Sequence, residues 1–256
     1  MRAIETSALT KRYGETTAVD SLDLTVPEGT VYGFLGPNGS GKTTTMRMLT
    51  GLTTPTSGTA TVTGVSVTNR KALRPHIGYL PEEPPLYEQA TAYEQLEYIA
   101  GLRDIPQQEV QNRIDSLLDR VGLSPDDAAT RIADYSKGMR QKVAYVQAVL
   151  HSPDIAFLDE PTSGLDPRAA RTIREHIREL TDEGTTVFLT THILPVVEEI
   201  ADTVGILYEG RLVAEDTPEQ LTRRAETGDA RTLEDAFLEV TSTDPAAGAS
   251  VEAEDD

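Results

Sequence analysis

The sequence predicts an α/β fold with a mostly parallel sheet, an N-terminal antiparallel β subdomain and an inserted helical subdomain. Short apolar runs typical of buried strands, at 31–35, 155–158 and 186–189, alternate with segments of helical character at 43–49 and 168–180. Such alternation is typical of parallel sheets with helices on their faces. The 256 residues are enough for one large domain or for a domain with a subdomain.

The antiparallel part is predicted from short alternating segments near the N-terminus. Two of them, 4–9 and 22–26, are separated by turn residues, and a similar segment follows at 58–67. Helical apolar spacing then appears at 93–102, 110–121 and 139–150, which predicts the helical subdomain. We therefore divide the chain into a core at 1–85 and 151–222 and a helical subdomain at 86–150. A C-terminal helical extension at 223–240 and a disordered acidic tail at 241–256 follow.

Composition excludes several classes of protein. The formal net charge is −19, with 18 Arg and 5 Lys, so the surface should repel nucleic acid and anionic lipid. No apolar run approaches the length of a membrane span, and the first residues lack the apolar centre of a signal peptide. We expect a cytoplasmic protein. The acidity favours a halophilic source over a merely soluble acidic protein, because molar salt screens such self-repulsion.

The segment 36–43 fits the phosphate-binding pattern GxxxxGK[ST] without a gap. A strand-like run precedes it and a helix-forming run follows it, which places backbone N–H groups around a phosphate chain. Lys42 supplies a charge for the β and γ phosphates, and the Thr43 hydroxyl is a ligand for Mg²⁺. The sequence therefore predicts nucleoside triphosphate binding through Gly36, Pro37, Asn38, Gly39, Ser40, Gly41, Lys42, Thr43 and Thr44.

Two acids follow the apolar run at 155–158. The carboxyl ends of strands are the ligand-binding edge of an open α/β sheet, so Asp159 and Glu160 are expected at the nucleotide. Asp159 is suited to hold Mg²⁺, and Glu160 to orient or deprotonate an attacking water. A strand that simply ends in solvent-facing acids is the alternative in a chain without the phosphate loop.

Further short motifs give the chain a specific resemblance over residues 3–222. Tyr135-Ser136-Lys137-Gly138-Met139 looks like an LSGGQ segment, Ser163-Gly164-Leu165-Asp166 like a D-loop, and Thr190-Thr191-His192 like a switch-histidine segment. With the two Walker motifs, 36–43 and 157–160, the chain resembles the nucleotide-binding subunit of ATP-binding cassette (ABC) transporters. Each short match is weak alone, but six in the family's order, including Tyr13 as the adenine-stacking aromatic, are strong together.

The resemblance implies a P-loop NTPase core that binds ATP with Mg²⁺ and hydrolyses it. Glu160 handles the water and His192 contacts the γ-phosphate. Two subunits, either two copies or a copy with a related ATPase subunit, pair head to tail. Ser136, Gly138 and Asp166 of one subunit then complete the site of the other. The partner in transport is a separately encoded, multi-spanning permease, which places the ATPase on the cytoplasmic face of the cell membrane.

Three positions depart from the family pattern. Glu82 stands where a Gln usually contacts Mg²⁺ and water, and a carboxylate is also a suitable metal ligand. Lys137 and Met139 replace a Gly and the Gln of the LSGGQ segment. Glu82 and the segment 233–238 are similar to exporters with ABC-2-type membrane partners, although an ordinary amphipathic helix explains 233–238 nearly as well.

The alternative function is a soluble ABC ATPase that acts on ribosomes or DNA, or a regulatory module without turnover. A single nucleotide site in an acidic chain argues against the first, and the presence of both Glu160 and His192 argues against the second. The leading interpretation is an ATPase that powers transport, in the export direction.

Overall fold

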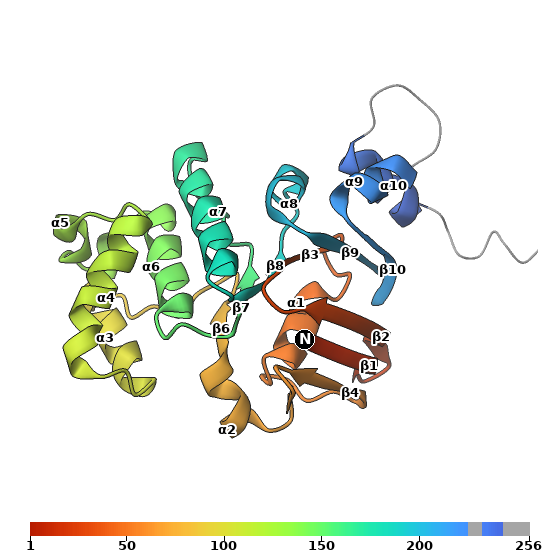
Figure 1. The fold of residues 1–256 in the computed structure, drawn as a ribbon, viewed down its shortest axis with the longest axis horizontal. Helices are drawn as coiled ribbons and strands as arrows, with labels where there is room; N and C mark the ends of the chain where they lie inside the picture. The colour runs from red at the N-terminus through yellow and green to blue at the C-terminus, as the bar shows by residue number, and fades with distance from the viewer. Residues whose placement is uncertain (225–231, 243–256) are drawn as a thin grey trace, which may run out of the picture.

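The computed structural model describes residues 1–224 and 232–242 of the chain (Figure 1). In these residues the strands form a four-stranded sheet in the order β2-β1-β4-β5 and a six-stranded sheet in the order β10-β9-β3-β8-β7-β6. The first sheet is antiparallel and the second is mostly parallel. The predicted α/β class is therefore confirmed.

The antiparallel sheet is centred on a long hairpin. It consists of β1 (Arg2–Tyr13), β2 (Thr16–Pro27), β4 (Ser57–Val62) and β5 (Val65–Ser66). In the second half of β2, Leu22, Leu24 and Val26 are buried and alternate with exposed residues, as expected for a sheet with one covered face. The first two strands are longer than the predicted 4–9 and 22–26. The reason is that Tyr13 pairs directly with Thr16 across a tight turn.

The six-stranded sheet brings three strand ends together. It is built from β3 (Val31–Leu35), β6 (Ile77–Leu80), β7 (Ile155–Asp159), β8 (Thr186–Thr190), β9 (Thr203–Tyr208) and β10 (Arg211–Asp216). Every residue of β3, β7 and β8 is buried, as in parallel strands covered on both faces. Because β3 and β7 both pair in parallel with β8, their carboxyl ends meet at one edge.

Helix α1 (Lys42–Leu49) contributes to the core between the two sheets. Its buried side chains Met46, Met48 and Leu49 belong to an apolar cluster that contains residues of β1, β2 and β3. In the same cluster the ring of Tyr32 stacks on that of Phe188 with 5.3 Å between centroids. This packing fixes the start of α1 directly beyond β3.

The helical subdomain lies at the opposite end of the molecule from the antiparallel sheet (Figure 1). It contains α3 (Ala92–Leu102), α4 (Gln107–Arg120), α5 (Pro125–Ala128) and α6 (Lys137–Val149). A capping box between Thr91 and Glu94 begins α3. The three longer helices agree with the predicted segments to within a few residues, since their apolar spacing is that of an amphipathic helix.

The remaining helices are α2 (Arg70–Leu73), α7 (Pro167–Asp182), α8 (Leu194–Ile200), α9 (Pro218–Arg224) and α10 (Leu233–Ser242). Thr241 and Ser242 were predicted to begin the acidic tail, but they belong to α10, where the Thr241 hydroxyl donates to the carbonyl of Phe237. Most of the predicted tail, 243–256, and part of the predicted extension, 225–231, lie outside the described residues.

Candidate active site

Glycine shapes the loop between β3 and α1. Gly39 and Gly41 have φ angles of 83° and 109°, a region that other residues rarely adopt. A Cβ at Gly36 would lie 2.3 Å from the carbonyl oxygen of Leu207, and one at Gly41 would lie 2.3 Å from that of Ala18. The first turn of α1 carries no acidic side chain, which leaves the positive end of its dipole for an anion.

Lys42 closes this loop on itself. Its Nζ donates to the carbonyl of Gly36 at 2.6 Å and to that of Pro37 at 3.0 Å. Burial lowers the pKa of Lys42, while nearby carboxylates, Glu160 foremost, act in the opposite direction. The ammonium group therefore stands between the loop carbonyls and a set of acids.

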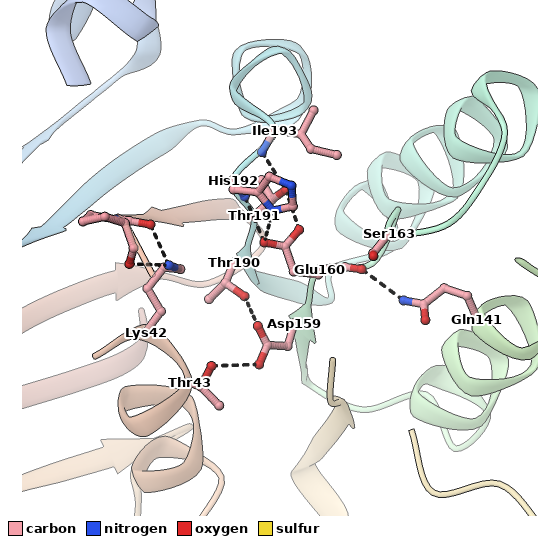
Figure 2. Close-up of polar contacts among 12 residues, drawn as sticks. Lys42, Thr43, Gln141, Asp159, Glu160, Ser163, Thr190, Thr191, His192 and Ile193 are labelled. Carbon is pink, nitrogen blue, oxygen red and sulfur yellow. Dashed lines mark hydrogen bonds and ion pairs between the residues drawn. The ribbon is translucent and has the colours of Figure 1, made fainter. Parts of the chain in front are cut away.

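Asp159 is the last residue of β7 and is 3% exposed. Its Oδ2 lies 3.4 Å from Oγ1 of Thr43, and its Oδ1 accepts a hydrogen bond from the Thr190 hydroxyl (Figure 2). Burial raises the pKa of Asp159, and the bond from Thr190 opposes that rise. The Thr43 hydroxyl at the start of α1 and the Asp159 carboxylate at the end of β7 thus lie next to each other at the edge of the sheet.

Glu160 follows in a left-handed conformation, with φ of 50°. Its Oε1 accepts from the backbone N–H of His192 at 2.9 Å and lies 2.8 Å from Nδ1 of the same residue (Figure 2). Its Oε2 accepts from the hydroxyl of Thr191, a fully buried residue, at 3.0 Å. Both carboxylate oxygens are therefore held by the segment that follows β8.

A cavity of about 680 Å³ lies over these groups. It brings together most of the predicted site residues: Gly36, Pro37, Asn38, Gly39, Gly41, Lys42, Thr43, Thr44, Glu82, Asp159, Glu160 and His192. Ser40 does not line the cavity. It is 3% exposed, and its Oγ has no hydrogen-bond partner among the described residues.

The region from β2 to the turn after Glu160 matches a known family. A model of that family, described as ABC transporter, fits residues 19–163, which is more than half of the chain. The chain belongs to the ABC transporter family. The match includes the glycine loop at 36–43 and the LSGGQ-like segment at 135–139, which we call the signature segment. It also includes Asp159 and Glu160.

Members of the family are similar to this cassette over most of its length. The bacitracin transport ATP-binding protein BcrA of Enterococcus faecalis is 40% identical over 223 residues, 86% of this chain and 71% of that protein. The daunorubicin/doxorubicin resistance ATP-binding protein DrrA of Streptomyces peucetius is 43% identical over 222 residues, which are 86% of this chain and 67% of that protein. A solved ATP-binding subunit of an ABC transporter superposes with a TM-score of 0.86 at 31% identity. The superposition covers 93% of this chain and 99% of that chain. This ABC cassette is an ATPase subunit.

The residues at the cavity of this ABC cassette fit a magnesium nucleotide. The glycine loop, the N-terminus of α1 and Lys42 suit a phosphate chain. Within 1–224 and 232–242, no cluster of three or more His, Cys, Asp or Glu side chains could hold a metal by itself. The Thr43 hydroxyl and the Asp159 carboxylate are oxygen donors that suit Mg²⁺, an ion that takes one or two protein ligands beside phosphate oxygens and water.

Tyr13, predicted to stack on adenine, is not among the residues that line the cavity. It ends β1, is 50% exposed, and its ring lies 5.1 Å from Nζ of Lys11. An exposed ring at the end of a strand is available as a stacking surface. Its role in adenine binding stays a prediction.

Ser136, Gly138 and Asp166 also lie outside the cavity lining. Ser136 caps α6 by accepting from the N–H of Met139, and Asp166 caps α7 by accepting from those of Arg168 and Ala169. The backbone bonds of this cap lower the pKa of Asp166. Both residues therefore have a structural role within their own subunit, whatever they contact in another.

Two polar residues beside Glu160 were not predicted. Thr191 lies in the switch-histidine segment 190–192, and its hydroxyl donates to the carboxylate of Glu160. Gln141 lies two residues beyond the LSGGQ-like segment, and its Nε2 donates to the main-chain carbonyl of Glu160 at 3.0 Å (Figure 2). The signal in the sequence was a Gln on the otherwise apolar side of a helix, a pattern that requires a buried partner. Phe237 of α10 also reaches the cavity.

Proposed function

We propose that this ABC ATPase powers export through a separately encoded membrane permease. The observation that carries the proposal is its similarity, over 86% of the chain, to proteins of bacitracin transport and daunorubicin/doxorubicin resistance. An ATP-driven transporter that confers resistance does so most directly by moving the drug outward. Among the described residues, no helix is both long enough and apolar enough to cross a bilayer.

Nucleotide binding is assigned to the loop and its flanks. The N–H groups of the glycine loop and of Thr44 would donate to the phosphates, and the Lys42 ammonium would exchange its loop carbonyls for phosphate oxygens. Ser40 belongs to the same loop. The Ser40 side chain approaches position 36 so closely that only glycine fits there. Tyr13 would provide a stacking surface for adenine.

Thr43, Asp159 and Glu82 are the residues that would hold Mg²⁺, directly or through water. When bound, the ion supplies positive charge that neutralises the phosphate oxygens during phosphoryl transfer. Thr43 and Asp159 already lie together, and Glu82 lines the same cavity. Glu82 replaces the amide common in the family, so its charge adds to that of Asp159.

Hydrolysis is assigned to Glu160 and His192. The Glu160 carboxylate would orient the attacking water and accept its proton. His192 is well placed to contact the γ-phosphate, because its side chain is 69% exposed and lines the cavity beside Glu160. The left-handed turn at Glu160 turns its carboxylate back toward the end of β8, where His192 and Thr191 hold it.

The active assembly is an ATP-dependent pair of subunits, of two copies or of one copy with a related ATPase subunit. Ser136 stands at the N-terminus of α6, a position suited to an anion, yet outside its own cavity. Ser136, Gly138 and Asp166 of one subunit would complete the site of the other. In this arrangement the pair works on the cytoplasmic face of the cell membrane, bound to its permease.

Purification of the tagged full chain from cells that express it from its own locus tests the function. We expect a multi-spanning membrane protein to copurify, and Glu160→Gln to bind ATP without turning it over. The exposed carboxylate of Glu109 provides the control, since Glu109→Gln makes the same change in charge away from the site. Copurification with ribosomes or DNA in place of a membrane protein would contradict the proposal.

A further inference from the structure

Helix α6 is bonded directly to the turn that carries Glu160. The helix begins at the signature segment, with Ser136 as its N-cap, and Gln141 lies less than two turns further along. Gln141 is 4% exposed and comes from the helical subdomain, while Glu160 follows a strand of the central sheet. The 3.0 Å bond between them therefore links the helical subdomain to the central sheet.

The orientation of the Gln141 amide is fixed by its partner. A main-chain carbonyl only accepts hydrogen bonds, so the Nε2 group, which only donates, must face it. The same carbonyl accepts a second bond, from the N–H of Ser163 at 3.0 Å, and the Glu160 N–H donates to Thr190 at 3.0 Å. The peptide groups on both sides of Glu160 are therefore held in place by hydrogen bonds.

These hydrogen bonds matter at Glu160 because the backbone of this residue is strained. A non-glycine residue in the left-handed region persists only where its surroundings hold it there. Gln141 is the one of these partners that belongs to the helical subdomain. The remaining bonds come from the strand edge and from the turn itself.

Other contacts along the start of α6 follow the same loop. The Lys137 Nζ lies 3.3 Å from the hydroxyl of Ser163, and Gly138 packs against Gly164 and Leu165. A shift of α6 relative to the sheet would move these contacts together with the Glu160 carbonyl. The segment proposed to meet the nucleotide of the other subunit is thus joined to the main chain of Glu160 in its own subunit, while Thr191 and His192 hold the carboxylate.

We propose that Gln141 is a positioning residue for Glu160, so that the placement of α6 sets the orientation of the Glu160 carboxylate. The inference rests on the role of Glu160 in hydrolysis that is proposed above. It extends that role by making hydrolysis in each site depend on where the signature helix of the same subunit stands. Gln141 itself does not line the cavity, and it acts through Glu160.

The test compares Gln141→Met with Gln147→Met in the full-length chain. Gln147 is on the same helix and its Oε1 accepts from Nε2 of Gln95 at 2.7 Å, so its replacement also breaks one side-chain hydrogen bond, a partly buried one, away from Glu160. We expect kcat of Gln141→Met to fall about tenfold or more, with the dissociation constant for ATP within about twofold of wild type. Gln147→Met should keep wild-type kcat.

A second variant removes dependence on the folding of the first. Gln141→Glu presents an acceptor to the carbonyl when ionised and a donor when protonated. Its kcat relative to wild type should therefore rise as the pH is lowered from about 8.5 to about 6, because burial raises the pKa of a carboxyl group. Thermal unfolding of the variant at both pH values separates this recovery from a loss of stability caused by the buried charge.

Equal kcat values for Gln141→Met and Gln147→Met would overturn the inference. So would a Gln141→Glu profile that runs parallel to wild type, which decides the matter even where Gln141→Met does not fold. The proposed role of Glu160 is judged separately, by whether Glu160→Gln still hydrolyses ATP. Inactive Glu160→Gln beside fully active Gln141→Met would leave that role intact and remove only the positioning.

Discussion

His192 reaches the carboxylate of Glu160 twice at one oxygen, through its backbone N–H at 2.9 Å and through Nδ1 at 2.8 Å. The backbone bond does not depend on the imidazole. Replacement of the side chain should therefore leave the carboxylate in place and remove only the group proposed to contact the γ-phosphate.

We predict that His192→Ala lowers kcat for ATP hydrolysis about 10²- to 10³-fold, the usual cost of removing one preorganised donor to developing negative charge. ATP binding should change little, and so should the unfolding temperature, because the side chain is 69% exposed. Steady-state hydrolysis, nucleotide titration and thermal unfolding measure the three quantities. A variant that retains most of the wild-type kcat would contradict the role given to His192.

The cap of α6 allows the composite site to be tested without loss of the helix. Asp is as good an N-cap as Ser, so Ser136→Asp should keep α6 and place a negative charge where the phosphate of the other subunit is expected. We predict that Ser136→Asp abolishes the ATP-dependent dimer in a Glu160→Gln background. Ser136→Thr, which keeps the hydroxyl, should still form it. Size-exclusion chromatography with and without ATP distinguishes them, and a dimer formed equally well by both would rule out the composite site.

His151 makes part of the stability depend on pH. Its Nε2 lies 2.9 Å from the carbonyl of Ile77, and burial lowers the pKa of the imidazole to about 4. In the unfolded chain the imidazole binds a proton near pH 6.5, so protons favour unfolding. The stability that the fold gains by holding His151 neutral is complete above pH 6.5 and is lost as the pH falls toward 4.

We predict that His151→Gln removes this component. Between pH 7 and pH 5 the free energy of unfolding of the wild type should fall by about 1 kcal/mol more than that of the variant, a figure that allows for partial solvent screening. Denaturant unfolding at both pH values and constant high salt gives the difference. Identical pH slopes for the two proteins would show that His151 is not held neutral by the fold.

The net charge of −19 predicts a protein that is stabilised by salt. At 1 M ionic strength the Debye length is about 3 Å, which suppresses repulsion between surface carboxylates. The unfolding temperature should therefore be higher in molar KCl than in dilute buffer. An unfolding temperature independent of KCl would argue against adaptation of the chain to high salt.

The sequence predicted those parts of the site that are contiguous. The loop at Lys42 and the acids at Asp159 each follow a buried strand, and parallel pairing through β8 brings both to one edge. Their proximity therefore required only the prediction of a parallel sheet.

Contacts between distant segments could not be predicted in the same way. The bond from Gln141 to Glu160 depends on how α6 packs against the sheet, which no local pattern encodes. The strand β6 has four residues, too few for an apolar run to distinguish it from a helix or loop segment. The length of the hairpin β1–β2 depends on pairing between strands and not on the alternation within either one.

The left-handed turn at Glu160 sets stability against activity at a single position. A non-glycine residue in that conformation costs about 1–3 kcal/mol, a penalty that glycine avoids. Glycine at 160 would remove this backbone cost, but it would also remove the carboxylate that accepts from the Thr191 hydroxyl and from the N–H of His192. The backbone cost and the proposed catalytic group therefore belong to the same residue, so stability engineered at position 160 would act directly on the carboxylate to which we assign ATP hydrolysis.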